Sequence, residues 1–157
     1  MAQSTEPTTL VELLRGRAQQ TPDGHAYTFL ADGKKASLPL TYGELDRQAR
    51  AIGALLQQLQ AQGERVLLLY PQGLEVLAAF SGCLYAGAIA IPVPPPESGR
   101  LKRTLPRLRA IVGDAGAKFA LTTAGILSLV ENVKEEFPEF QQMHWIDTAT
   151  VDLSLAE

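Results

Sequence analysis

The stretch RVLLLYPQGLEVLAAFSGCLYAGAIAIPV, residues 65–93, decides the fold class of this chain. Its five consecutive apolar residues, 66–70, are typical of a strand covered on both faces, as strands of parallel sheets are. The following segment is predicted to form a helix that ends near Gly87. Residues 88–93 form a second apolar, β-compatible run. A strand, a helix and another strand in this order indicate a parallel βαβ unit.

Two helices are predicted before this unit, and each begins at a Thr that has a Glu three residues later, the spacing of a capping box. The first helix begins at Thr9 and the second at Thr41, and Gly63 is expected to end the second. Between the helices, two short strands flank the dipeptide Asp32-Gly33. This pattern predicts a short N-terminal β-hairpin.

The alternation of helices and strands continues after the unit. Pro106 is expected to lie in the first turn of the next helix, because proline has no N–H to donate further along. The order predicts an α/β fold: a mostly parallel sheet with helices on its faces, plus the hairpin. The later predicted elements are a helix over 105–116, a strand over 118–123, a helix over 124–137 and a strand over 143–147.

Four prolines crowd the exit of the second predicted strand, at positions 92, 94, 95 and 96. Proline donates nothing to a sheet ladder and holds φ near −65°. Ligands of open parallel sheets bind beyond the carboxyl ends of the strands, and this segment leaves such an end. The residues alone leave two roles open: a stiff connector to the next helix, or one wall of a crevice.

Composition narrows the class of protein. A chain of 157 residues with a net charge of −3 suits one domain and shows no basic footprint for nucleic acid. No apolar run approaches the roughly 18 residues of a membrane span, and the N-terminus has no secretory pattern. Cys83 is the only cysteine, which excludes an intrachain disulfide. We therefore expect a cytoplasmic protein without a nucleic-acid partner or a membrane span.

The search for catalytic motifs is negative. The sequence lacks G-x-G-x-x-G, G-x-x-x-x-G-K-[ST] and G-x-S-x-G, and it has no Cys/His cluster. His25 and His144 are isolated, which favours structural or surface roles. Cys83 has no nearby His and is interpreted as a buried thiol rather than a nucleophile.

Two aspartates, Asp147 and Asp46, stand at positions that indicate a role. Asp147 follows the last predicted strand, where it would either face a ligand or begin a turn, and turns are the commoner use. Asp46 and Arg50 are four residues apart in a predicted helix and are expected to form a surface pair.

Two stretches carry a resemblance to a known family. LTYGELDRQARAIGALL, residues 40–56, resembles the first core motif of the adenylate-forming enzymes, and GCLYAGAIAIPVPPP, residues 82–96, resembles the second. The longer run over 65–123 is most similar to the fatty acyl-AMP ligases. No catalytic, cofactor-binding or metal-binding residue is carried over. The positions that match the motifs are scaffold residues: Thr41, Tyr42, Glu44, Leu45, Ala86, Gly87, Pro92 and Pro94.

The resemblance implies an activity for a parent enzyme. A fatty acid would be activated by ATP, with Mg²⁺, to an acyl-adenylate and then passed to an acyl carrier protein, in lipid, polyketide or hydrocarbon biosynthesis. The family's phosphate loop, ribose-binding Asp and C-terminal catalytic Lys are missing from the sequence.

Because these family segments are missing, the chain is expected to be only part of a domain. Residues 1–157 are expected to be the N-terminal portion of the large domain, incomplete and inactive alone, with flexible ends at 1–8 and 148–157 and no bound cofactor. The alternatives are a fatty acyl-CoA ligase fragment and a stand-alone, non-catalytic α/β binding module.

Overall fold

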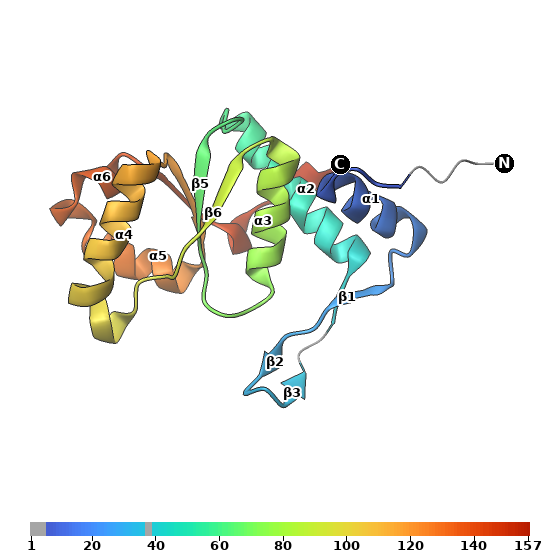
Figure 1. Cartoon of the computed structure of the whole chain (residues 1–157), viewed down its shortest axis with the longest axis horizontal. Helices are drawn as coiled ribbons and strands as arrows, with labels where there is room; N and C mark the ends of the chain where they lie inside the picture. Colours follow the sequence, from blue (N-terminus) through green and yellow to red (C-terminus); the bar gives the residue numbers. More distant parts are fainter. Residues whose placement is uncertain (1–5, 37–38) are drawn as a thin grey trace.

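A four-stranded parallel sheet lies at the centre of the computed structural model, which describes residues 6–36 and 39–157 (Figure 1). The strand order is β6-β5-β7-β8, and every neighbouring pair is parallel. This confirms the predicted parallel α/β sheet. The strands are β5 (Arg65–Leu69), β6 (Ile89–Pro92), β7 (Phe119–Thr122) and β8 (His144–Asp147).

Strand β5 is buried on both faces, as its unbroken apolar sequence predicts. Val66 and Leu68 belong to the core on one side of the sheet, and Leu67 and Leu69 belong to the core on the other side. Because side chains alternate along a strand, one apolar run supplies two separate cores.

Helices cover both faces of the sheet and complete a three-layer arrangement (Figure 1). The first core contains apolar side chains of α2 and α3, and the second contains those of α4, α5 and α6. The described part of the chain has no helix long and apolar enough to cross a membrane. The covering helices are α2 (Tyr42–Gln58) and α3 (Glu75–Ala86), then α4 (Leu101–Ala115), α5 (Ala124–Glu131) and α6 (Pro138–Gln141).

Helices α2 and α3 approach closely through glycine. A Cβ atom added at Gly82 of α3 would lie 2.6 Å from Cγ2 of Ile52, and one added at Gly53 of α2 would lie 3.0 Å from Cβ of Tyr85. Both distances are shorter than comfortable carbon–carbon contacts. The two glycines therefore set the separation of the helices.

The N-terminal part of the chain adds a helix and two small antiparallel pairs. In the hairpin, Asp32 and Gly33 have φ values of 54° and 67°. This left-handed geometry suits a tight turn and confirms the predicted hairpin. The remaining elements are α1 (Leu10–Gln20), β2 (Leu30–Ala31) paired with β3 (Lys35–Ala36), and β1 (His25–Tyr27) paired with β4 (Leu40–Thr41).

Three predicted helix boundaries are wrong. The helix predicted over 124–137 ends at Glu131, because the Val133 N–H donates to the Val130 carbonyl in a tighter turn, and the 3₁₀ turn η2 (Lys134–Glu136) follows. Helix α2 ends at Gln58 rather than near Gly63, because Gln60 adopts φ 58° and the N–H of Ala61 donates to the Leu56 carbonyl. That bond closes the helix with a non-glycine residue. Helix α4 begins at Leu101, so Pro106 lies beyond the first turn and the helix tolerates the loss of one backbone donor.

The C-terminal residues pack back onto the domain. Residues 148–157, expected to be a flexible end, form the two 3₁₀ turns η3 (Thr148–Thr150) and η4 (Leu153–Ala156). Turn η4 contacts α2, and the Arg50 guanidinium donates to the Ala156 carbonyl. Of the other expected flexible end, 1–8, residues 1–5 lie outside the described residues.

Candidate functional site

The residues of the first motif begin helix α2. The Thr41 hydroxyl accepts a hydrogen bond from the Glu44 N–H at 3.2 Å, and the Thr41 N–H donates to the Glu44 carboxylate at 2.9 Å. The two bonds form the complete capping box that the spacing predicts. The backbone N–H of Thr41 lowers the pKa of the Glu44 carboxyl, and the Thr41 hydroxyl adds to the effect.

The residues of the second motif turn the chain from α3 into β6. Gly87 has φ 71° and closes α3, whose last residue, Ala86, is buried. Pro92 ends the edge strand β6, where its missing donor breaks no ladder, since the Val93 N–H supplies the bond to the Leu68 carbonyl. Residues of both motifs therefore begin or end secondary-structure elements.

The proline exit fills both roles that the sequence left open. It connects β6 to the turn η1 (Ser98–Arg100) that precedes α4. Pro94 and Pro95 also line a pocket of about 200 Å³ against α4, together with Arg103 and Arg107. The segment is thus a connector that borders a small basic hollow.

A pocket of about 510 Å³ lies at the carboxyl ends of β7 and β8, the edge where parallel sheets bind ligands. We call it the carboxyl-edge pocket. Its walls come from α2, α3 and the segments that follow the two strands, and include Glu75, Thr123, Gly125 and Asp147. This agrees with the general position expected for a ligand in this fold class.

Hydrogen bonds hold this edge in shape. The Thr122 hydroxyl donates to the Leu69 carbonyl at 2.7 Å, and the hydroxyls of Tyr70 and Thr148 are bonded at 2.9 Å. Burial raises the pKa of the Tyr70 phenol, so the group stays neutral. The Asp147 carboxylate accepts the Ala149 N–H at 3.0 Å, which begins a turn even though the residue also lines the pocket.

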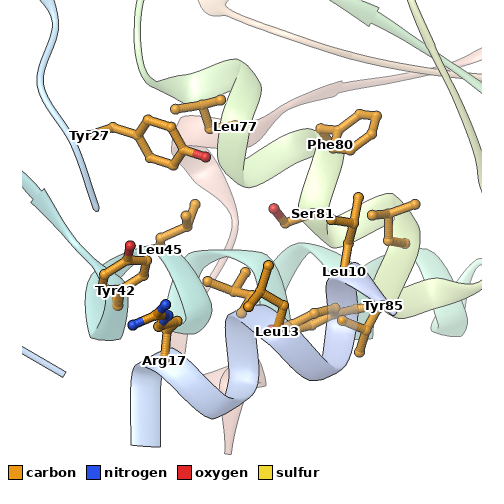
Figure 2. A pocket seen from close by; sticks show the side chains of 13 residues that line it. Leu10, Leu13, Arg17, Tyr27, Tyr42, Leu45, Leu77, Phe80, Ser81 and Tyr85 are labelled. Atoms are coloured by element: carbon orange, nitrogen blue, oxygen red, sulfur yellow. The ribbon is translucent and has the colours of Figure 1, made fainter. Parts of the chain in front are cut away.

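A third pocket, of about 290 Å³, lies between α1, α2, α3 and β1, and we call it the α1 groove (Figure 2). Tyr42 and Leu45 of the first motif line it. Apolar side chains from α1 and α3 form most of its walls, and Arg17 supplies a cation. No local sequence pattern indicates this groove, because its walls come from four separate elements.

Asp46 joins α2 to α3, which corrects the expectation of a surface pair. The Arg50 Nε donates to Asp46 at 2.8 Å, as predicted, but Asp46 is only 8% exposed. The Tyr85 hydroxyl donates to the other Asp46 oxygen at 2.6 Å. Burial and this carboxylate raise the pKa of Tyr85, so the phenol remains a donor.

Cys83, His144 and His25, the other titratable residues considered from the sequence, are buried or contact neighbouring side chains. Burial raises the pKa of the Cys83 thiol to about 12, which makes it a poor nucleophile at neutral pH. The His144 ring stacks on Phe119, and the His25 ring contacts the Thr28 hydroxyl. Within residues 6–36 and 39–157, no group of three His, Cys, Asp or Glu side chains is placed to hold a metal ion.

Comparisons with known proteins agree with this scaffold. The family model described as AMP-binding enzyme matches residues 14–155. The medium-chain-fatty-acid–acyl-carrier-protein ligase JamA of Moorena producens is 48% identical over 97% of this chain and 26% of its own length. Disco-interacting protein 2 of Drosophila melanogaster is 37% identical over 81% of this chain and 7% of its own length.

A solved structure supports the same relationship. The fatty acid AMP ligase from Legionella pneumophila has a TM-score of 0.78 and 33% identity, over 96% of this chain and 25% of its own. The chain thus spans about a quarter of the ligases that it matches. On the match over residues 14–155, the chain belongs to the AMP-binding enzyme family.

Proposed function

We propose that residues 1–157 are the N-terminal portion of the large domain of a fatty acyl-AMP ligase that is longer than this chain. The observation that carries the proposal is the 48% identity with a fatty-acid–acyl-carrier-protein ligase across 97% of this chain. The likeness in fold and sequence to a fatty acid AMP ligase supports it.

The proposed reaction has two steps. A carboxylate oxygen of the fatty acid attacks the α-phosphorus of ATP, the bond to pyrophosphate breaks, and an acyl-adenylate forms. The phosphopantetheine thiol of an acyl carrier protein then attacks the acyl carbonyl, and AMP leaves. Rate enhancement in such phosphate chemistry comes mainly from positioning and charge neutralisation.

This chain would contribute scaffold to that reaction. The capping box at Thr41 fixes the start of α2, and Gly87 and Pro92 direct the chain through β6. The carboxyl-edge pocket provides part of a ligand-binding wall. The eight motif residues hold these elements in place and, on this proposal, do not contact the reacting atoms.

ATP and Mg²⁺ belong to the proposed reaction of the whole enzyme. The sequence has no Gly-rich phosphate loop, and the described residues bring no suitable set of ligands together for a metal ion. We therefore assign none of them to Mg²⁺ and derive no step through it. A cytoplasmic location is part of the proposal, supported by the single, buried cysteine.

The test compares the 157-residue chain with the full product of its gene in ATP–pyrophosphate exchange, across a series of fatty acids. The full product is expected to catalyse fatty-acid-dependent exchange, and the 157-residue chain is expected to catalyse none. Robust exchange by the chain alone would contradict the scaffold role. Absence of exchange by the full product would contradict the ligase and favour a non-catalytic binding module.

A second assay identifies the thiol acceptor. The full product is given ATP, Mg²⁺ and a fatty acid, with either coenzyme A or a phosphopantetheinylated carrier protein. We expect loading of the carrier protein and poor use of coenzyme A, because the relative with 48% identity is a carrier-protein ligase. Acyl-CoA formation at a comparable rate would assign the enzyme to the fatty acyl-CoA ligases instead.

A further inference from the structure

The α1 groove contains a cation, Arg17, that forms no ion pair with any described residue. The residues three and four positions away on α1 and just after it are Leu13, Leu14, Gln20 and Thr21, none of which is acidic. A guanidinium at the edge of an apolar pocket fits a carboxylate ligand, since arginine can hold a carboxylate through two parallel hydrogen bonds.

Residues with hydroxyl groups also line the groove. Tyr27, Tyr42 and Ser81 line it, and within the described residues their hydroxyls make no hydrogen bond with the protein. Figure 2 shows the Ser81 hydroxyl directed into the groove from α3. These groups add hydrogen-bonding capacity next to the guanidinium.

The apolar part of the groove lies beside this polar part. In Figure 2, Arg17 and Tyr42 lie toward one end, and Leu10, Phe80 and Tyr85 lie toward the other. Leu10 and Leu13 are 60% and 41% exposed, so α1 leaves apolar surface uncovered along this side. The arrangement therefore matches a ligand that has one charged end and one apolar end.

We propose that the α1 groove binds a short aliphatic carboxylate, with its carboxylate on Arg17 and its alkyl chain between α1 and α3. The volume of about 290 Å³ lies near the lower limit for ligand pockets and selects a small molecule. This site is separate from the carboxyl-edge pocket and shares no lining residue with it. The proposal does not depend on the proposed function, because it requires neither ATP nor acyl transfer.

The test measures octanoate binding to the 157-residue chain without ATP, by calorimetry and by amide chemical shifts. Octanoate is expected to bind about tenfold more tightly than hexanoate, because two further CH₂ groups are buried. It should also bind about tenfold more tightly than 1-octanol, which lacks the charge. The shifts should centre on Leu13 and Ser81.

Two substitutions at matched positions separate this site from non-specific binding. Arg17→Gln should weaken octanoate binding about tenfold and leave 1-octanol binding unchanged. Arg47→Gln removes the same charge from an exposed position of α2 outside the groove lining, and should change octanoate binding less than twofold. Ser81→Leu should weaken both ligands by filling the groove. If it fails to fold, the arginine pair still decides.

Three results would overturn the proposal. One is the absence of binding at millimolar octanoate. Another is an equal effect of Arg17→Gln and Arg47→Gln. The third is a set of shifts centred on Gly125 and Asp147, which would place the ligand in the carboxyl-edge pocket. Each of these results is measured by binding alone, without an enzymatic assay. A failure of the groove proposal can therefore be distinguished from a failure of the ligase proposal.

Discussion

Helices α1 and α2 begin with the same local signal but differ in their attachment to the domain. Each follows a Thr that has a Glu three residues later, and each Thr hydroxyl accepts the N–H of that Glu. Helix α2 has seven buried residues, whereas α1 has none. A capping signal therefore predicts the first residue of a helix. How much of the helix is buried depends instead on which other elements pack against its apolar side.

The two caps also differ in detail. In α2, the Glu44 carboxylate accepts the N–H of the capping residue Thr41. In α1, the Glu12 carboxylate instead accepts the N–H and hydroxyl of Thr8, one residue before the cap. Because α1 buries little surface, we expect it to open locally, while α2 opens only when the whole domain unfolds. The following predictions test this difference.

The largest effect is expected from adding one methyl group to a glycine of α3 that contacts α2, compared with the same change at a glycine of α1. Gly82→Ala should lower the global free energy of unfolding by about 1–3 kcal/mol, because the new Cβ meets Ile52 at 2.6 Å. Gly16→Ala on α1 meets nothing within 4 Å, and should stabilise α1 by up to about 1 kcal/mol through helix propensity.

Chemical denaturation measures the first substitution, and amide hydrogen exchange of α1 measures the second. If Gly16→Ala raised the global free energy of unfolding as well, α1 would belong to the same cooperative unit as α2.

An intermediate effect is expected from removing each cap. Thr41→Ala should cost about 0.5–2 kcal/mol of global stability, since it removes the hydroxyl that accepts the Glu44 N–H and donates to the Glu44 carboxylate. Thr9→Ala should reduce exchange protection only within α1. In the full enzyme, Thr41→Ala should leave the apparent affinity for ATP nearly unchanged. A large loss of ATP affinity at intact stability would instead make Thr41 a ligand contact.

The smallest effect concerns acid stability. The folded-state pKa of Glu44 lies below its ordinary value of 4.5, because the Thr41 N–H donates to the carboxylate. Its contribution is therefore fully present above the ordinary pKa and is lost as the pH falls through the lower, folded value. Glu44→Gln should flatten the decline in stability below about pH 4.5.

Glu12→Gln is the matched control. The pKa of Glu12 is also lowered, by the Thr8 N–H and hydroxyl, but its helix should open independently of the domain. The global denaturation curve of Glu12→Gln should therefore show an unchanged dependence on pH. An equal flattening in both variants would remove the distinction between the helices.

The parallel fold was predictable because its signals are local. The apolar run of β5, the cap at Thr41 and the αL residue Gly87 each act within a few residues, and the structure confirms all three. The end of α2 was not predictable in this way. Gln60 adopts the left-handed conformation although Gly63 is close by, and the bond from Ala61 to Leu56 closes the helix.

The candidate sites were less predictable because they depend on distant contacts. The rule for parallel sheets gave the general position of the carboxyl-edge pocket. It did not reveal the bond from Arg50 to the Ala156 carbonyl, which joins residues 106 positions apart. The α1 groove could not be predicted from the sequence. Its lining residues Arg17 and Ser81 lie far apart in the chain and line one groove only when α1 packs beside α3.

The strand order affects how this chain folds while it is being synthesised. Strand β5 is central, and both of its partners lie after it in the sequence: β6 ends at Pro92 and β7 ends at Thr122. During synthesis, the apolar residues of β5 emerge long before the strand that covers their second edge. Such an unpaired, hydrophobic strand invites aggregation, and non-local parallel pairing is slow. We therefore expect the nascent chain to remain prone to aggregation until β7 has emerged.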